Sequence, residues 1–199
     1  MNKIKSEQSG RSMVEMLGVL AIIGVLSVGG IAGYSKAMAK FKLSKAMDQI
    51  STIVANVRTL YSSQPSYSDL TTEVAIRIGA IPTEMLNGQS ATTATAIYNA
   101  YNGPVYVENA ALFTQSYQTF VIGFGGLGKE ACVALLTADW GRESGSGFVA
   151  AGAGSYKSIK PAALGAVIKQ SGKKEITLSD AATQCSGTGD TNFVALEFY

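Results

Sequence analysis

An uninterrupted apolar stretch near the start of the chain constrains its fold more than any other feature. From Met16 to Tyr34 the sequence contains no charged residue. A helix of this length extends roughly 28 Å, which is close to the thickness of the hydrocarbon core of a bilayer. Glu15 lies immediately before the stretch, and an acidic side chain costs roughly 3 kcal/mol near the centre of a membrane helix. A carboxylate in this position therefore calls for a functional explanation.

Two simple interpretations of the stretch leave part of it unexplained. A secretory signal peptide could be cleaved after Ala37-Met38-Ala39, so that the mature protein begins at Lys40. The apolar region of such peptides is normally only about 7–15 residues long. A plain membrane anchor fits the length and the basic residues on the N-terminal side, but it gives Glu15 no role.

A third interpretation rests on the polar leader that precedes the stretch. The leader ends at Gly10, and the run around this residue, Ser9-Gly10-Arg11-Ser12-Met13-Val14-Glu15-Met16-Leu17, resembles the processing site of type IV prepilins. The resemblance implies that a prepilin peptidase cuts between Gly10 and Arg11 and that the new α-amine of Arg11 is methylated. Glu15 becomes the fifth mature residue, to which the resemblance assigns a role in assembly and register. The family usually has an apolar residue after the cut, whereas this chain has Arg11.

The residues after the apolar stretch continue as an amphipathic helix. Apolar side chains recur at spacings of four and three, at Leu43, Met47, Ile50, Val54, Val57 and Tyr61. The other side carries polar residues, Gln49 and Asn56 among them. No proline precedes Pro65, so one helix is predicted from about Ser12 to Ser62. The apolar stripe spans fewer than three heptads, which favours packing on a globular head over a coiled coil.

The remainder of the chain predicts an α+β head. Strands are expected at 104–108, 118–124, 175–178 and 192–199, short helices at 72–81 and 129–138, and an irregular surface loop at 139–155. Three or more strands against a helix form an α+β unit. The predicted organisation is a cleaved leader at 1–10, a helix at 11–62 with its membrane-spanning part at 16–34, and a head at 63–199.

Two cysteines, Cys132 and Cys185, lie in this head. Such a pair favours a disulfide in a protein that enters or crosses a membrane, but two free thiols in the cytosol. The segment Thr119–Phe124, followed by a small-residue turn and a helix with Cys132, resembles type IVb pilins such as the bundle-forming and toxin-coregulated pilins. Cys185 shortly before a last strand extends the resemblance.

The type IVb resemblance implies a pilin fold, in which a long N-terminal helix packs by its second half on an antiparallel β-sheet. It also implies a disulfide between Cys132 and Cys185. That bond would close a loop of about 54 residues, which is worth roughly 4 kcal/mol of loop-closure entropy. The region 132–185 would then be a variable surface that contacts neighbouring subunits.

Several classes of function are disfavoured by the composition. The chain has no histidine, which excludes Ser-His-Asp and Cys-His sites and removes the commonest metal ligand. The segment Gly123–Gly128 matches G-x-G-x-x-G, but no parallel strand with an acidic residue is predicted about 20 positions later. We interpret it as a turn and a helix cap. With a net charge of +2, specific nucleic-acid binding is not predicted either, and no cofactor or metal is expected.

Together these observations favour a structural protein over an enzyme. The resemblance implies a subunit held in the inner membrane of a Gram-negative bacterium that polymerises with copies of itself into an extracellular helical pilus. Its other partners would be the prepilin peptidase, the pilus assembly platform and minor pilins. A minor pilin or a pseudopilin of a pilus or type II secretion system is an alternative. A membrane-anchored enzyme is a more distant one, because no catalytic constellation is present.

Overall fold

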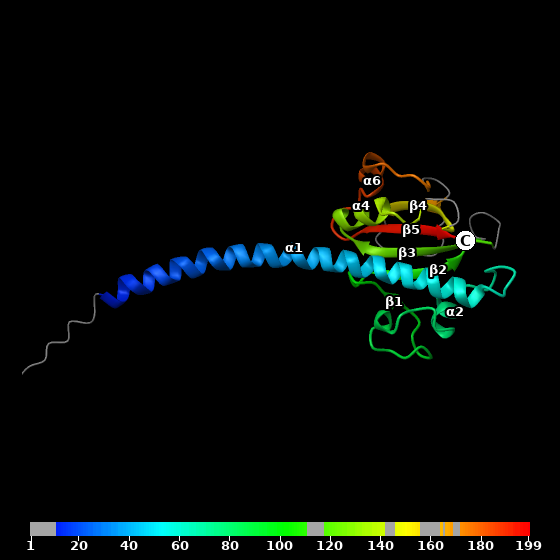
Figure 1. Ribbon diagram of the computed structural model, residues 1–199, viewed down its shortest axis with the longest axis horizontal. Coiled ribbons are helices and arrows are strands. Elements are labelled where there is room, and N and C mark those ends of the chain that lie inside the picture. The colour runs from blue at the N-terminus through cyan, green and yellow to red at the C-terminus, as the bar shows by residue number, and fades with distance from the viewer. Residues whose placement is uncertain (1–10, 111–117, 142–145, 156–163, 165, 169–171) are drawn as a thin grey trace, which may run out of the picture. The chain divides into compact units, whose positions relative to one another are not determined.

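The computed structural model describes residues 11–110, 118–141, 146–155, 164, 166–168 and 172–199 (Figure 1). The chain divides into two compact units, Met1–Phe41 and Lys42–Tyr199, and we call the second unit the head. Helix α1 (Arg11–Tyr61) contributes residues to both units. Its bounds agree to within one residue with the helix predicted at 11–62.

In the first unit, the described residues belong to α1, and the large apolar side chains from Met13 to Tyr34 are exposed. Val25 is 76% exposed and Leu26 is 67% exposed. Among the residues that the structure describes, one helix, over Met13–Tyr61, is long and apolar enough to cross a bilayer. Its five glycines have open space beside them at Gly18, Gly24, Gly29, Gly30 and Gly33. Small residues of this kind allow a second helix to approach closely.

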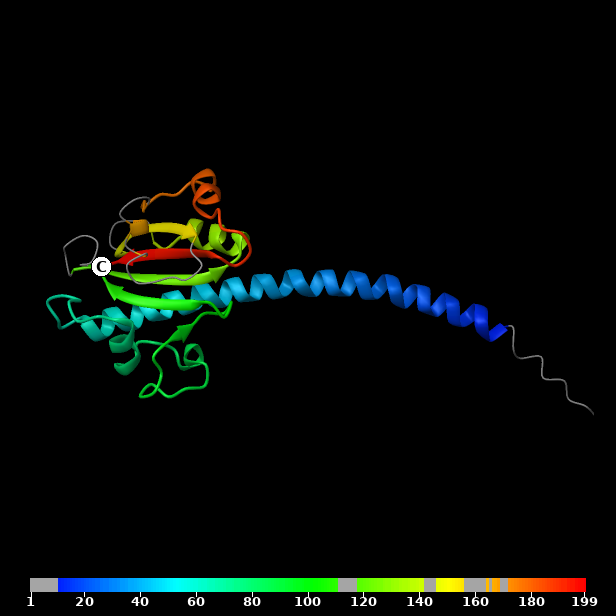
Figure 2. The same cartoon turned by 180° about the vertical axis from the view of Figure 1, so that it is seen from behind.

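The described part of the head contains one antiparallel sheet with the strand order β1-β2-β3-β5-β4. The strands are β1 (Ile97–Tyr98), β2 (Pro104–Asn109), β3 (Phe120–Leu127), β4 (Phe148–Ser155) and β5 (Asn192–Phe198). The shorter helices are α2 (Thr72–Arg77), η1 (Thr83–Leu86), α4 (Lys129–Thr137) and α6 (Leu178–Gln184). Figure 2 shows the same sheet from behind, with β5 lying between β3 and β4.

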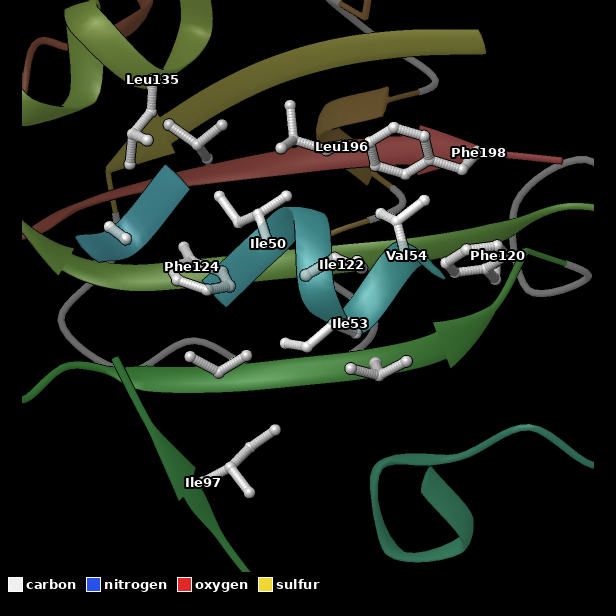
Figure 3. Close-up of a cluster of buried hydrophobic side chains, with 14 of the residues drawn as sticks. Ile50, Ile53, Val54, Ile97, Phe120, Ile122, Phe124, Leu135, Leu196 and Phe198 are labelled. Carbon is white, nitrogen blue, oxygen red and sulfur yellow. The ribbon is translucent and has the colours of Figure 1, made fainter. Parts of the chain in front are cut away.

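One face of the sheet is covered by the second half of α1. Ile50 and Ile53 are fully buried and lie over Ile122, Phe124 and Leu196 of the central strands (Figure 3). Full burial of such a side chain contributes roughly 1.5–3 kcal/mol. The predicted stripe is therefore the part of α1 that packs on the sheet, and Leu43 and Met47 complete it as partly buried residues.

The opposite face of the sheet is also covered. Val121, Phe193 and Ala195 form a second buried cluster with residues of the segment 164–168. All residues of β5 are buried as a result. A strand that is buried on both faces becomes apolar along its whole length, which weakens the alternation that otherwise marks a strand.

Two predictions for the head were wrong. The surface loop predicted at 139–155 contains β4, and the strand predicted at 175–178 leads instead into α6. Strand β4 consists mostly of small residues with low strand propensity. At one of them, Gly154, a Cβ would lie only 2.9 Å from the ring of Phe193. The side chain of Thr177 accepts a hydrogen bond from the Asp180 N–H, so it caps a helix at the point where alternation suggested a strand.

The G-x-G-x-x-G segment has a structural role, although not entirely the one predicted. Most of it lies within β3, where the register with β5 shifts between Phe124 and Leu127. Gly126 has φ +67° and packs against Gly103 of the neighbouring turn, a conformation and a proximity that favour glycine. Gly128 is the N-cap of α4, as expected. Both neighbours of β3 are antiparallel to it, unlike the strands of a dinucleotide-binding unit.

Among the described residues of the head, two carboxyl groups are buried. Glu197 is 3% exposed and accepts a hydrogen bond of 2.7 Å from the Thr119 hydroxyl. Glu108 is 8% exposed and accepts one of 2.9 Å from Thr72. Burial raises the pKa of both carboxyl groups above the usual range, and the hydrogen bonds oppose it only in part.

The raised pKa of Glu197 predicts a pH dependence of stability. Between its unfolded and folded pKa values the folded head binds more protons than the unfolded chain, so this group lowers stability as the pH rises. Glu197→Gln keeps an acceptor for Thr119 and removes the charge. At pH values above the folded pKa of Glu197, we expect Glu197→Gln to have a higher free energy of unfolding than the parent protein. Between the two pKa values, the stability of the variant should decline less as the pH rises.

Urea unfolding of the detergent-solubilised chain at a series of pH values, followed by the fluorescence of Trp140, measures this effect. Glu175→Gln, at an exposed position, controls for the loss of one negative charge. Identical pH profiles for Glu197→Gln and the parent protein would contradict the prediction.

Candidate functional site

The disulfide is the first element of the candidate site. Cys132 on α4 is bonded to Cys185 at the end of α6, with 5.9 Å between the Cα atoms. Both cysteines are fully excluded from solvent. The bond implied by the resemblance is therefore present, and it encloses β4 and α6 within one covalent loop.

Polar contacts hold the region between the cysteines to the sheet. The backbone of Ala151 in β4 exchanges two hydrogen bonds of 2.9 Å with the backbone of Lys173. The side chain of Gln184 accepts a hydrogen bond of 2.8 Å from the Ala153 N–H. These contacts partly occupy the outer edge of β4, which would otherwise offer free backbone groups to another chain.

The fully buried Asn192 closes the region on its other side. Its amide donates a hydrogen bond of 3.1 Å to the carbonyl oxygen of Leu127 at the end of β3. Its Oδ1 accepts one of 2.7 Å from the Gly187 N–H. A single side chain thus joins β3, the turn after Cys185 and the start of β5.

A second set of contacts, which sequence reasoning missed, fixes α1 to the segment between α2 and β2. Gln49 belongs to the predicted polar side of the helix, yet it is buried, with only 4% of its surface exposed. It donates a hydrogen bond of 3.0 Å to Glu84 and accepts one of 3.1 Å from the Ala100 N–H. The Nζ atom of Lys45 lies 3.3 Å from Oε2 of Glu84. The hydrogen bond from Gln49, and then Lys45, lower the pKa of the Glu84 carboxyl group.

Asn56 and Arg58 make further contacts of this kind. Asn56 donates a hydrogen bond of 3.0 Å to the carbonyl oxygen of Ala80. Arg58 donates one of 2.7 Å to the backbone oxygen of Tyr199, and its guanidinium lies 5.6 Å from the ring centre of Phe198. The chain therefore covers both flanks of α1 in the head as well as its apolar stripe. Helical spacing could suggest only the stripe.

The residues predicted for processing and assembly lie in the first unit. Gly10 and the rest of the leader fall outside the described residues. Arg11 is the first residue of α1, and Glu15 is an exposed residue of its next turn. The ion pairs that the structure describes all lie in the head, so none of them involves Glu15.

A cavity of about 600 Å³ in the head lies between α2 and the strands β1 and β2. Glu73 and Glu108 are among the residues that line it, but the carboxylate of Glu108 accepts hydrogen bonds from both the hydroxyl and the backbone N–H of Thr72. Within the described ranges, no group of three or more metal-ligating side chains is found. The hydrogen bonds from Thr72 show that the carboxylate of Glu108 has a structural role.

Comparison with known proteins shows which family has this arrangement. The profile of a family described as PilS N terminal matches residues 41–197. The major structural subunit of the bundle-forming pilus of Escherichia coli O127:H6 (strain E2348/69 / EPEC) is 29% identical over 192 residues, covering 96% of this chain and 94% of that protein. The protein of the same description from Escherichia coli O111:H- is 28% identical over 191 residues, with coverage of 96% and 94%.

A solved structure supports the same assignment at the level of the fold. The crystal structure of type IV b pilin from Salmonella typhi has a TM-score of 0.52 and 17% sequence identity, covering 79% of this chain and 97% of that chain. The fold and the disulfide-bounded region together define a type IVb-like pilin, a class with a structural and not an enzymatic role. The chain belongs to the PilS N-terminal family, because the profile of that family matches more than half of the residues of this chain. The predicted fold and class are confirmed.

Removal of the disulfide should destabilise the head. For Cys132→Ser combined with Cys185→Ser we expect a loss of roughly 4 kcal/mol in the free energy of unfolding, because the unfolded chain regains the entropy of the open loop. The urea midpoint and the rate of tryptic digestion measure this loss. Ala182→Ser, at an exposed position of α6, should change the stability by less than about 0.5 kcal/mol. An unchanged midpoint for the double variant would show that the bond contributes no stability.

Proposed function

We propose that the protein is the main structural subunit of a type IVb-like pilus. Subunits are held in the inner membrane, processed between Gly10 and Arg11, and then polymerised with copies of themselves into an extracellular filament. The observation that carries this proposal is the exposed apolar helix in the same chain as a pilin head. The two Escherichia coli pilus subunits, which match 96% of the chain, support it.

The exposed apolar surface of α1 needs a cover both before and after assembly. Side chains such as Val28, at 72% exposure, are unfavourable in water by about 25 cal/mol for each Å² of apolar surface. The bilayer provides the cover for a single subunit. In the filament, the same helices of neighbouring subunits provide it, so transfer from lipid to filament leaves the apolar surface dry throughout.

Glu15 gives this transfer its register. We propose that its carboxylate pairs with the α-amine of Arg11 on a neighbouring subunit, an amine that exists only after cleavage by the prepilin peptidase. In a dry bundle, a charge without its partner costs about 3–5 kcal/mol. A subunit out of register, or one that still carries its leader, is therefore disfavoured. The assembly platform and minor pilins complete the set of proposed partners.

The mature N-terminus tests the processing step. Mass spectrometry of the membrane-extracted protein should find a chain that begins at N-methylated Arg11. Gly10→Leu should leave the leader attached, since the peptidase requires a small residue before the cut. A mature protein that begins at Met1 would instead indicate a plain anchor, and one that begins at Lys40 a secreted protein.

Substitution of Glu15 tests the assembly step. Glu15→Gln removes the charge at nearly constant volume, and it leaves the neighbouring amine unpaired at a cost of about 3 kcal/mol per contact. We expect membrane insertion to be unchanged and the yield of sheared filaments to fall more than about tenfold. Lys36→Ala, which removes a charge at the other end of the apolar stretch, is the matched control. Normal filaments from Glu15→Gln would refute the pairing.

A further inference from the structure

Two Asn-Gly dipeptides occur in the chain, Asn87-Gly88 and Asn102-Gly103. Both asparagines have a left-handed backbone, with φ 52° at Asn87 and 62° at Asn102. Glycine has no Cβ, so its backbone nitrogen is the least hindered one to approach the side-chain amide of a preceding asparagine. In the unfolded chain the two dipeptides are chemically alike. The folded head surrounds them differently.

The first dipeptide is open to solvent. Asn87 ends η1 as an exposed residue. A Cβ placed on Gly88 would meet nothing within 4 Å. Among the described residues, neither the Asn87 side chain nor the Gly88 N–H takes part in a hydrogen bond, although the next residue, Gln89, donates one of 3.1 Å to Leu86.

The second dipeptide is held at the atom that would react. The Gly103 N–H donates a hydrogen bond of 3.0 Å to Oδ1 of the buried Asn99. Asn99 is itself fixed, since its amide donates one of 2.8 Å to the carbonyl oxygen of Gly125. Gly103 is buried and packed against the backbone of Gly125 and Gly126. Its nitrogen can approach the Asn102 side chain only if this turn opens.

From this contrast we propose that Asn87 is a site of spontaneous deamidation in the folded protein and that Asn99 protects Asn102 from the same reaction. The backbone nitrogen of Gly88 attacks Cγ of Asn87 and forms a C–N bond. The Cγ–Nδ2 bond breaks, and the nitrogen leaves as ammonia with the proton given up by the Gly88 amide. Water then opens the succinimide at either carbonyl and yields aspartate or isoaspartate. Neither an oxidant nor a reductant is required.

The reaction adds a negative charge to one defined place on the head. Asn87 lies three residues after Glu84, which is paired with Lys45 on α1, so the product adds a second carboxylate three residues along the chain from this ion pair. The open space at Gly88 also leaves room for the extra backbone atom of isoaspartate. The inference concerns the folded head and does not depend on the proposed role in a pilus.

The test compares the two sites within one molecule. The purified full-length chain is incubated in detergent at neutral pH and physiological temperature, then digested with chymotrypsin, which cleaves after Tyr98 and Tyr101 and so separates the two asparagines. Mass spectrometry detects the exchange of amide for acid, and isoaspartyl methyltransferase labels isoaspartate. We expect conversion at Asn87 to be at least about tenfold faster than at Asn102, because only Asn102 requires local opening.

Unfolding and two variants complete the test. In concentrated urea the two rates should converge, since the difference arises from the fold. Asn87→Gln should remove the fast product, and Asn99→Ala should accelerate conversion at Asn102. If Asn99→Ala fails to fold, the comparison of native and urea-unfolded parent protein still decides. Equal rates in the native protein, a faster Asn102, or an Asn87 that converts only in urea would each overturn the proposal.

Discussion

Burial of the α1 stripe against the central strands organises the head. Ile50 and Ile53 fill the space over Ile122 and Leu196, and polar contacts gather around this packing. Gln49 and Asn56 are positioned on the flanks of the same helix, where they bind the segments that run beside it. Each of these hydrogen bonds contributes only about 0.5–1.5 kcal/mol, so they refine the position of segments that apolar burial has already drawn together.

The disulfide-bounded region is built on this base by different means. It adds β4 to a sheet whose other strands are already packed on α1, and it relies on a covalent bond, backbone pairing with Lys173 and the buried Asn192. Its Leu164 and Ile168 join Val121 of β3 and Phe193 of β5 in a second apolar cluster, which lies on the face of the sheet away from α1. The head therefore has two cores on one sheet, and β5 contributes residues to both.

Sequence reasoning predicted the parts of the fold in which one physical signal dominates. The stripe from Leu43 to Tyr61 indicated the packed half of α1, and the resemblance around Cys132 and Cys185 indicated the disulfide. It failed where tertiary contacts select residues against local propensity. In β4, Gly154 leaves room for the ring of Phe193, and the buried Gln49 is hydrogen-bonded to Glu84 and Ala100 in the segment after α2. Such contacts leave no periodic pattern in the sequence.

The position of β5 has a consequence for the timing of folding. This strand comes last in the chain order, yet it lies between β3 and β4 and pairs with both. Neither face of the sheet is complete until β5 has paired with its two neighbours. A chain in which β5 has not yet been added therefore holds an incomplete head. Pairings over such long sequence separations also form slowly. The head is therefore complete only once β5 has paired with both β3 and β4, and only then are both faces of its sheet in place around the Cys132–Cys185 bond.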